Sequence, residues 1–198
     1  MNRAAHDDEN YGTGMKVWLD QQEVQQLLDA AEDTEQRIAF GLGARCGLRS
    51  QEWLDVEPRH VTDTSMGTVL QVPAGKGDKY RETPITTELA TAIRTVGDIE
   101  GDDTTPVIRS ASSTRVLRKW MARARDRLAE EHEKPEWRDV SPHDLRRTWA
   151  TQLRAAGCDP LVVLNWGGWE DLETFLDHYQ GSHTPEMQKR ERQKADWL

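Results

Sequence analysis

The chain has 198 residues, 36% of them hydrophobic and 31% charged, and a formal net charge of −9 at pH 7. This length and the eight tryptophans favour one folded domain with a packed core over a disordered chain. No stretch approaches the roughly 18 apolar residues that span a bilayer, and no signal peptide is visible, so we expect a cytoplasmic protein with no membrane partner.

The first predicted element is a polar, glycine-containing stretch at residues 1–14, which we expect to be a flexible tail. Asp20 is a typical helix N-cap, and apolar residues at helical spacing follow it. A second helix is expected from about Asp33 to a stop at Gly47, and Ser50 is expected to cap a short third helix. The first part of the chain is therefore predicted to be helical.

The pattern changes after these helices to short runs that are typical of strands. The expected strands cover residues 60–64, 68–72 and 80–85, and the glycine-rich stretches between them supply turns. Helices are expected again at residues 87–96, 113–133, 143–156 and 161–166, and in the last thirty residues. We therefore predict a mainly α fold with a small antiparallel β-sheet (α+β), formed by a single domain over residues 15–198.

The charges are unevenly distributed along the chain. The net acidity argues against a nucleic-acid partner, because phosphate contacts dominate DNA affinity. However, basic residues cluster in the helix predicted at 113–133, and four of them are candidate contacts to a DNA backbone: Arg115, Arg118, Lys119 and Arg123. A basic groove inside an acidic shell is one interpretation, and the halophile-like acidic surface of a protein from a salt-loving host is another. A solvated helix face is the ordinary alternative for this cluster.

Two segments in the first half of the chain carry side chains of chemical interest. Arg49 lies at a helix junction with Glu52 three residues later, so the carboxylate can pair with a buried guanidinium; an ordinary junction salt bridge is the alternative. Lys76 lies between two glycines in a predicted hairpin turn, where it could reach a phosphate or donate a proton; taken alone, this motif favours an ordinary solvated lysine.

Two further segments lie in the second half. His143 and Arg146 share one face in the first turn of a helix, and an arginine and a histidine pointing outward there would form an anion site. A capped helix with exposed charges is the alternative. Tyr179, preceded by Gly167-Gly168-Trp169, stands near the end of a predicted helix, where a packed aromatic residue is the ordinary interpretation. Neither the histidine nor the two cysteines, Cys46 and Cys158, has metal-ligand spacing, so no metal or other cofactor is predicted.

Together these segments resemble the tyrosine recombinases, a family that includes the phage integrases and the Xer-type recombinases. The shared order is Arg-x-x-Glu, a hairpin lysine, His-x-x-Arg, a glycine followed by His or Trp, and a tyrosine, over roughly residues 15–185. The resemblance implies a site-specific recombinase or integrase that cleaves and rejoins double-stranded DNA through a 3′-phosphotyrosyl intermediate. It also implies a homo-oligomer on DNA, as dimers or a tetramer, with a C-terminal helix at about 184–197 exchanged with a partner.

The resemblance assigns a role to each matching residue. Arg49 and Arg146 would clamp the scissile phosphate, with Glu52 supporting Arg49. Lys76 would be the general acid for the leaving oxygen, and Tyr179 the nucleophile. His143 would assist proton transfer, and Trp169 matches a position that holds His or Trp in the family.

The sequence also departs from the family pattern. Trp169 and Tyr179 are one position further apart than is usual, and Arg147 stands where many members have another histidine. The helical core-binding domain that usually precedes the catalytic part is not expected in this chain. A DNA-binding regulator without cleavage activity, and a DNA-relaxing enzyme of the type IB topoisomerase class, are therefore the alternatives.

Overall fold

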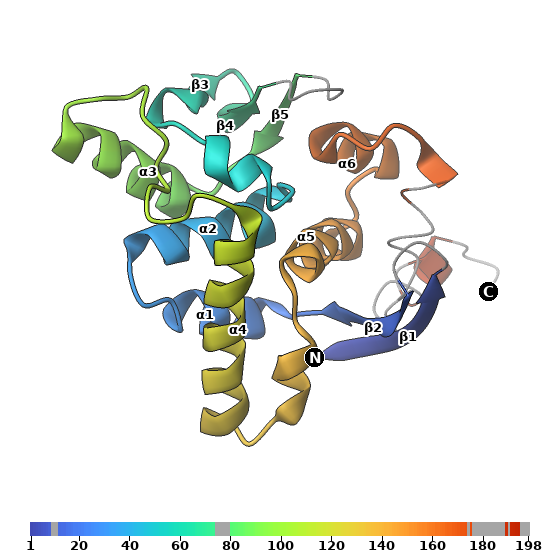
Figure 1. Cartoon of the computed structure of the whole chain (residues 1–198). Coiled ribbons are helices and arrows are strands. Elements are labelled where there is room, and N and C mark those ends of the chain that lie inside the picture. Colours follow the sequence, from blue (N-terminus) through green and yellow to red (C-terminus); the bar gives the residue numbers. More distant parts are fainter. Residues whose placement is uncertain (9–11, 74–79, 174, 176–188, 190, 195–198) are drawn as a thin grey trace.

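The computed structural model describes residues 1–8, 12–73, 80–173, 175, 189 and 191–194. Five strands and six α-helices are defined in this part of the chain (Figure 1). In chain order they are β1 (Asn2–Asp8), β2 (Gly12–Trp18), α1 (Gln21–Asp29), α2 (Thr34–Cys46), β3 (Val61–Thr64), β4 (Gly67–Val72), β5 (Arg81–Pro84), α3 (Thr87–Glu100), α4 (Thr114–Glu131), α5 (Pro142–Ala156) and α6 (Pro160–Gly167). Short 3₁₀ helices lie at Glu52–Asp55 (η1), Pro58–His60 (η2) and Pro135–Asp139 (η3).

The predicted fold class, mainly α with a small antiparallel sheet, is confirmed. The sheet has the order β3-β4-β5 with both pairs antiparallel, and Val72 of β4 lies opposite Arg81 of β5. The predicted helix boundaries also agree with the capping chemistry. Asp20 forms a capping box with Glu23 at the start of α1, Asp33 caps α2, and Gly47 ends α2 at a positive φ of 68°.

The flexible tail predicted at residues 1–14 is corrected by the structure. Residues 2–8 and 12–18 pair as an antiparallel hairpin, β1–β2. The N–H of Val17 donates to the Asp144 carboxylate at 3.1 Å, and the N–H of Leu19 donates to the Thr148 hydroxyl, also at 3.1 Å. Both acceptors lie on α5, more than 120 residues away in the sequence, so local sequence patterns could not indicate this anchor.

The core is organised around α2, which packs against α1, α3 and α5 (Figure 1). Its side chains are buried on most sides, including Phe40 and Leu42 with no exposed surface. Cys46, at the end of α2, is buried, and burial raises the pKa of its thiol, whereas Cys158 is half-buried. Within the described ranges, no helix is both long and apolar enough to cross a membrane.

Candidate functional site

Helix α5 places Arg146 in the interior of the protein. Ser141 and Asp144 form a capping box at the start of α5, one turn before Arg146. The guanidinium donates to the carbonyl oxygens of Gly47 at 2.5 Å and Gly167 at 2.8 Å, and the side chain is buried. His143 is exposed as expected, but the prediction that Arg146 also points outward is wrong. The tertiary contacts to the ends of α2 and α6, which are distant in sequence, bury its face of the helix.

Arg49 approaches Arg146 from the end of α2. The predicted pair with Glu52 is present: Arg49 donates from its backbone N–H to Oε2 at 2.6 Å and from Nη1 to Oε1 at 3.1 Å. Its Nη2 donates to the carbonyl of Gly168 at 3.0 Å. The side chain keeps 38% of its surface exposed, so its guanidinium is held by protein groups and also reaches solvent.

Arg81, at the start of β5, is a third arginine of the same cluster and was not predicted. Its Nη1 and Nη2 donate to the two carboxylate oxygens of Glu52 at 2.8 and 2.7 Å, and its Nε donates to the carbonyl of Trp166 at 3.1 Å. A signal existed in the sequence, because alternation along β5 puts Arg81 and Thr83 on the same buried face. A charged residue at such a position requires a partner.

The C-terminal end of α6 brings the three guanidiniums together. Arg81, Arg146 and Arg49 donate to the carbonyls of three consecutive residues, Trp166, Gly167 and Gly168, respectively. The last carbonyls of a helix lack partners within the helix and carry partial negative charge, which favours cations at this end. We call these three arginines together with Glu52 the arginine cluster.

Two glycines allow side chains to approach this helix end closely. A Cβ atom on Gly167 would lie 1.9 Å from the Trp169 ring, and one on Gly168 would lie 2.7 Å from the Arg81 side chain. Gly168 also has a positive φ of 68°, which residues with a side chain rarely adopt. The Gly-Gly-Trp sequence is therefore a packing requirement of the cluster.

The cluster has an excess of positive charge. Burial raises the pKa of Glu52, but the hydrogen bonds and charge of Arg81, the backbone N–H of Arg49 and the charge of Arg146 outweigh it and hold the pKa below the usual 4.5. Glu52 is therefore ionised at neutral pH and offsets one of the three guanidinium charges. The four side chains of the cluster carry three positive charges and one negative charge, and the guanidinium of Arg49 reaches solvent, so the cluster is suited to an oxyanion such as a phosphodiester.

Trp169 connects the cluster to the segment that leads to Tyr179. Its ring lies 4.0 Å from the Arg146 guanidinium carbon, stacks against Trp149 with centroids 6.2 Å apart, and contacts Phe175 with centroids 4.9 Å apart. Phe175 is fully buried. Of the predicted site residues, Arg49, Glu52, Arg146 and Trp169 therefore lie together, whereas Lys76 and Tyr179 lie outside the described residues.

The four predicted DNA-backbone contacts are all exposed on α4. Arg123 is 3.5 Å from Glu32, which also pairs with Arg127 at 3.0 Å. For Arg115, Arg118 and Lys119, the described part of the chain shows no ion pair. The predicted set therefore divides into three residues at the start of α4 and one, Arg123, whose charge is partly offset by a neighbouring carboxylate.

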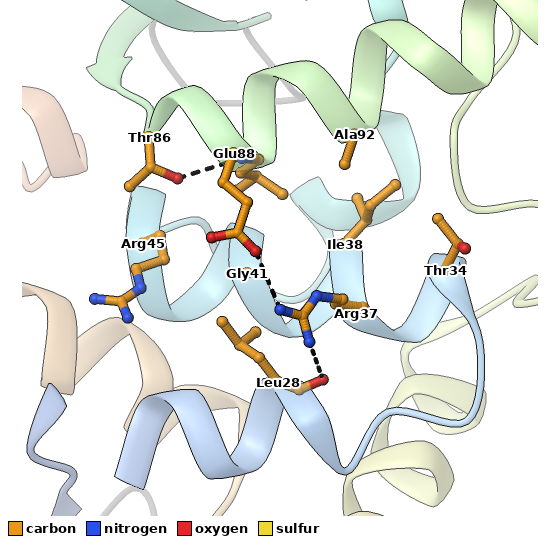
Figure 2. Close-up of a pocket in the computed structure, with 10 residues that line it drawn as sticks. Leu28, Thr34, Arg37, Ile38, Gly41, Arg45, Thr86, Glu88 and Ala92 are labelled. Carbon is orange, nitrogen blue, oxygen red and sulfur yellow. Dashed lines mark hydrogen bonds and ion pairs between the residues drawn. The ribbon is translucent and has the colours of Figure 1, made fainter. Parts of the chain in front are cut away.

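A separate hollow lies between α1, α2 and α3 (Figure 2). Arg37 crosses it and donates to the carbonyl of Leu28 at 3.0 Å and to the carboxylate of Glu88 at 3.1 Å. Its third partner is Asp29, at 2.8 Å. None of the residues that line this hollow belongs to the arginine cluster.

Comparison with known proteins agrees with this architecture. The model of the phage integrase family matches residues 17–185. The tyrosine recombinase XerC of Pelobacter propionicus is 32% identical over 130 residues, which are 65% of this chain and 41% of that protein. The chain thus spans less than half the length of this curated relative.

Solved structures show the same fold. The crystal structure of XerA recombinase has a TM-score of 0.73 at 20% identity, with 92% of this chain and 66% of that chain covered. The catalytic domain of bacteriophage HP1 integrase has a TM-score of 0.57 at 18% identity, with 92% of this chain and 96% of that chain covered. XerH recombinase, solved bound to its difH substrate, has a TM-score of 0.68 at 20% identity, with 97% and 59% covered. The fold is that of a tyrosine recombinase catalytic domain, and the chain belongs to the phage integrase family.

Proposed function

We propose that this chain is a DNA strand transferase that performs site-specific recombination through a covalent protein–DNA intermediate. The observation that carries the proposal is the arginine cluster. Arg49 comes from the junction after α2 and Arg146 from α5, 97 positions apart in the sequence, yet their guanidiniums bind consecutive carbonyls. Such convergence of charge, with the partly exposed side chain of Arg49 beside the buried one of Arg146, supports recognition of a scissile phosphate.

In the proposed reaction Arg49 and Arg146 stabilise the non-bridging oxygens of that phosphate. Arg146 is held by two carbonyls and by the Trp169 ring, so little reorganisation is needed when negative charge develops on the oxygens. Preorganised donors of this kind are typically worth about 3–4 kcal/mol each in the barrier. The two arginines would supply much of the catalysis, since the phenol of a tyrosine, with a pKa near 10, is a weak nucleophile at neutral pH.

Tyr179 is the proposed nucleophile. It lies four residues after Phe175, which contacts Trp169 beside Arg146. Four residues span at most about 14 Å, so a nucleophile at this position of the sequence is compatible with the chain length available from Phe175. The tyrosine in a partner subunit could also enter the site if the segment beyond Phe175 is exchanged. In either case the phenolic oxygen attacks phosphorus, and the bond to the 5′ oxygen breaks.

Lys76 is the proposed proton donor to the leaving 5′ oxygen, and His143 the proposed assistant in proton transfer. Lys76 lies in the segment that joins Val72 to Arg81, and Arg81 is itself part of the cluster. The 3′-phosphotyrosyl bond retains the energy of the broken diester bond. Attack by a 5′-hydroxyl then restores the DNA backbone and frees the tyrosine, so the proposed cycle consumes no nucleotide. The proposal assigns stabilisation of the phosphate charge to the two guanidiniums and includes no metal ion.

Double-stranded DNA is the proposed partner, bound by a homo-oligomer of dimers or a tetramer. XerH recombinase and the Tn1549 transposon integrase, which share the fold, were solved in complexes with DNA. The proposed contact to the backbone is the start of α4, with Arg115, Arg118 and Lys119. The exchange of a C-terminal helix at about 184–197 belongs to the same proposal and concerns residues mostly outside the described part of the chain.

A covalent-adduct assay tests the proposal. The protein is incubated with duplexes that carry a nick next to the cleavage position, so that the released 5′-end diffuses away and the adduct accumulates. We expect a denaturant-resistant protein–DNA adduct for the wild type and its complete loss in Tyr179→Phe, while DNA binding is unchanged. Tyr80→Phe, which removes an exposed phenol just before β5, is the matched control and should keep adduct formation.

The alternatives predict other results in the same assay. DNA binding with no adduct on any duplex would identify a regulator without cleavage activity. Adduct formation together with sequence-independent relaxation of supercoiled plasmid would indicate a topoisomerase-like enzyme.

A further inference from the structure

Arg81 uses its guanidinium entirely within the protein. Its three nitrogen atoms donate to the two oxygens of Glu52 and to the Trp166 carbonyl, and only 5% of its side chain is exposed. Arg49 shares the same carboxylate, but 38% of its side chain reaches the surface. Because Glu52 and the Trp166 carbonyl hold all three guanidinium nitrogens of Arg81, this residue is placed to act on its neighbours, whereas the exposed part of Arg49 is placed to act on a bound anion.

We propose that Arg81 is a positioning residue for the strand-transfer reaction. Its bidentate ion pair with Glu52 offsets the negative charge of that carboxylate, so that the positive charge of Arg49 can act on the scissile phosphate. This inference rests on the proposed function. In this role Glu52 orients Arg49 without cancelling its charge, because the stronger interaction of the carboxylate is with Arg81.

The charges of the cluster show why this matters. Three guanidiniums and one carboxylate leave a net charge of +2 beside the anion site. If Arg81 is replaced by a neutral residue, Arg49 is the ion-pair partner that remains to Glu52 among the described residues, and the summed charge of the cluster falls to +1. At a partly buried site the loss of one charge is weakly screened, so it should weaken stabilisation of a phosphate that gains charge in the transition state.

Arg81 also joins three segments of the site. It belongs to β5, its carboxylate partner belongs to η1, and its carbonyl partner lies in the last turn of α6. Because Arg81 is paired opposite Val72, the same residue fixes one end of the segment that carries Lys76. A single buried guanidinium thus joins η1, β5 and α6 beside the proposed phosphate clamp.

The test is the first-turnover rate of adduct formation at saturating nicked DNA, measured for the wild type, Arg81→Met, Glu52→Gln and the double variant. The rate constant reports the chemistry of folded molecules, and the amplitude reports the fraction that is folded. We expect Arg81→Met to lower the rate constant about 10-fold or more with little change in DNA affinity. We expect the double variant to recover most of that loss, since the neutral glutamine that replaces Glu52 can no longer offset the charge of Arg49.

Arg37→Met is the matched control. Arg37 also binds two carboxylates and a carbonyl, but it lies in the hollow between α1, α2 and α3, so its replacement should lower thermal stability and leave the rate constant unchanged (Figure 2). If Arg81→Met does not fold, Arg81→Lys takes its place. It keeps the charge but not the two-pronged geometry, and a smaller defect is expected, again relieved by Glu52→Gln.

Two results would overturn the inference. One is an Arg81 variant whose rate constant equals that of the wild type, with only the amplitude reduced. The other is a reduced rate constant that Glu52→Gln does not relieve. A wild type that forms no adduct would instead overturn the proposed function, so the two failures are distinguishable.

Discussion

At the scale of single residues, the site depends on positions where no side chain fits. Gly47 ends α2 with a positive φ, and a Cβ there would lie 2.2 Å from the Trp149 ring. Gly167 has no unusual backbone angle, but a Cβ would overlap the Trp169 ring. These glycines let two stacked tryptophans pack beside Arg146, and a methyl group at either position would disturb that packing.

Gly167→Ala should therefore be costly in both stability and activity. The added methyl group must displace Trp169, and overpacking of this kind costs about 1–3 kcal/mol. We expect a corresponding loss in the free energy of unfolding, measured with urea, together with slower adduct formation. Gly41→Ala is the control, since its Cβ would meet only the movable end of Leu89 at 3.1 Å and should change stability by less than about 1 kcal/mol. Equal stabilities for the two variants would contradict the steric argument.

At the scale of elements, Glu52 is the residue through which η1, β5 and the end of α2 are joined. β5 is far from the other two elements in the sequence, and it is linked to them by this carboxylate and by the Thr83 hydroxyl, which donates to the Cys46 carbonyl at 2.9 Å. Removing the charge of Glu52 leaves Arg81 as a buried cation without its carboxylate, and breaking a buried ion pair in this way typically costs roughly 3–5 kcal/mol. The free energy of unfolding should therefore depend on pH through the ionisation of Glu52.

The sign of that dependence follows from the pKa of Glu52. Because its folded-state pKa lies below the usual 4.5, its contribution to stability is present above pH 4.5 and is lost as the pH falls through the folded-state value. We expect Glu52→Gln to be much less stable than the wild type at neutral pH, and the difference to shrink as urea unfolding is repeated below pH 4.5.

Glu88→Gln is the matched control for this pH series. Its carboxylate is 72% exposed and pairs with Arg37 at 3.1 Å, so the substitution should have little effect at any pH. A stability difference for Glu52→Gln that stays constant down to strongly acidic pH would contradict the assignment of this carboxylate as ionised and paired.

At the scale of the whole molecule, the net charge of −9 coexists with local positive charge. The local positive charge lies in the arginine cluster and at the start of α4. Elsewhere, acidic side chains pair with surface arginines such as Arg37, Arg109 and Arg127. Overall charge is therefore a poor guide to the proposed partner, because a phosphate backbone interacts with the local surface within about a Debye length.

Salt dependence can show which basic residues of α4 bind the DNA backbone. For each phosphate that a variant no longer binds, the slope of log affinity against log salt concentration should become about 0.9 less steep. We expect this change for Arg118→Ala and Lys119→Ala, measured by DNA binding over a salt series. Arg127→Ala, which removes a partner of Glu32 further along the same helix, should leave the slope unchanged. If all three variants keep the slope of the wild type, the DNA contact lies on another surface.

How much of the fold the sequence could predict depended on the range of the interactions involved. Helix ends at Asp20, Asp33 and Gly47 are set by contacts within a few residues, and the predictions for them were confirmed. The hairpin at residues 2–18 depends on acceptors on α5, so it was missed. For the candidate site, the Arg49–Glu52 pair was predicted because its members are three residues apart, while Arg81, 29 residues from Glu52, was not.

By itself the sequence determined the types of reactive side chain, their order, and the capped helices and short strands that carry them, because these depend on local chemistry. Only the tertiary structure decided that Arg146 is buried, that Arg81 takes the charge of Glu52, and that three guanidiniums bind consecutive carbonyls at the end of α6. The physical reason is that burial and ion-pair partners are set by packing between elements far apart in the chain, and the spacing of residues along one element carries no record of it.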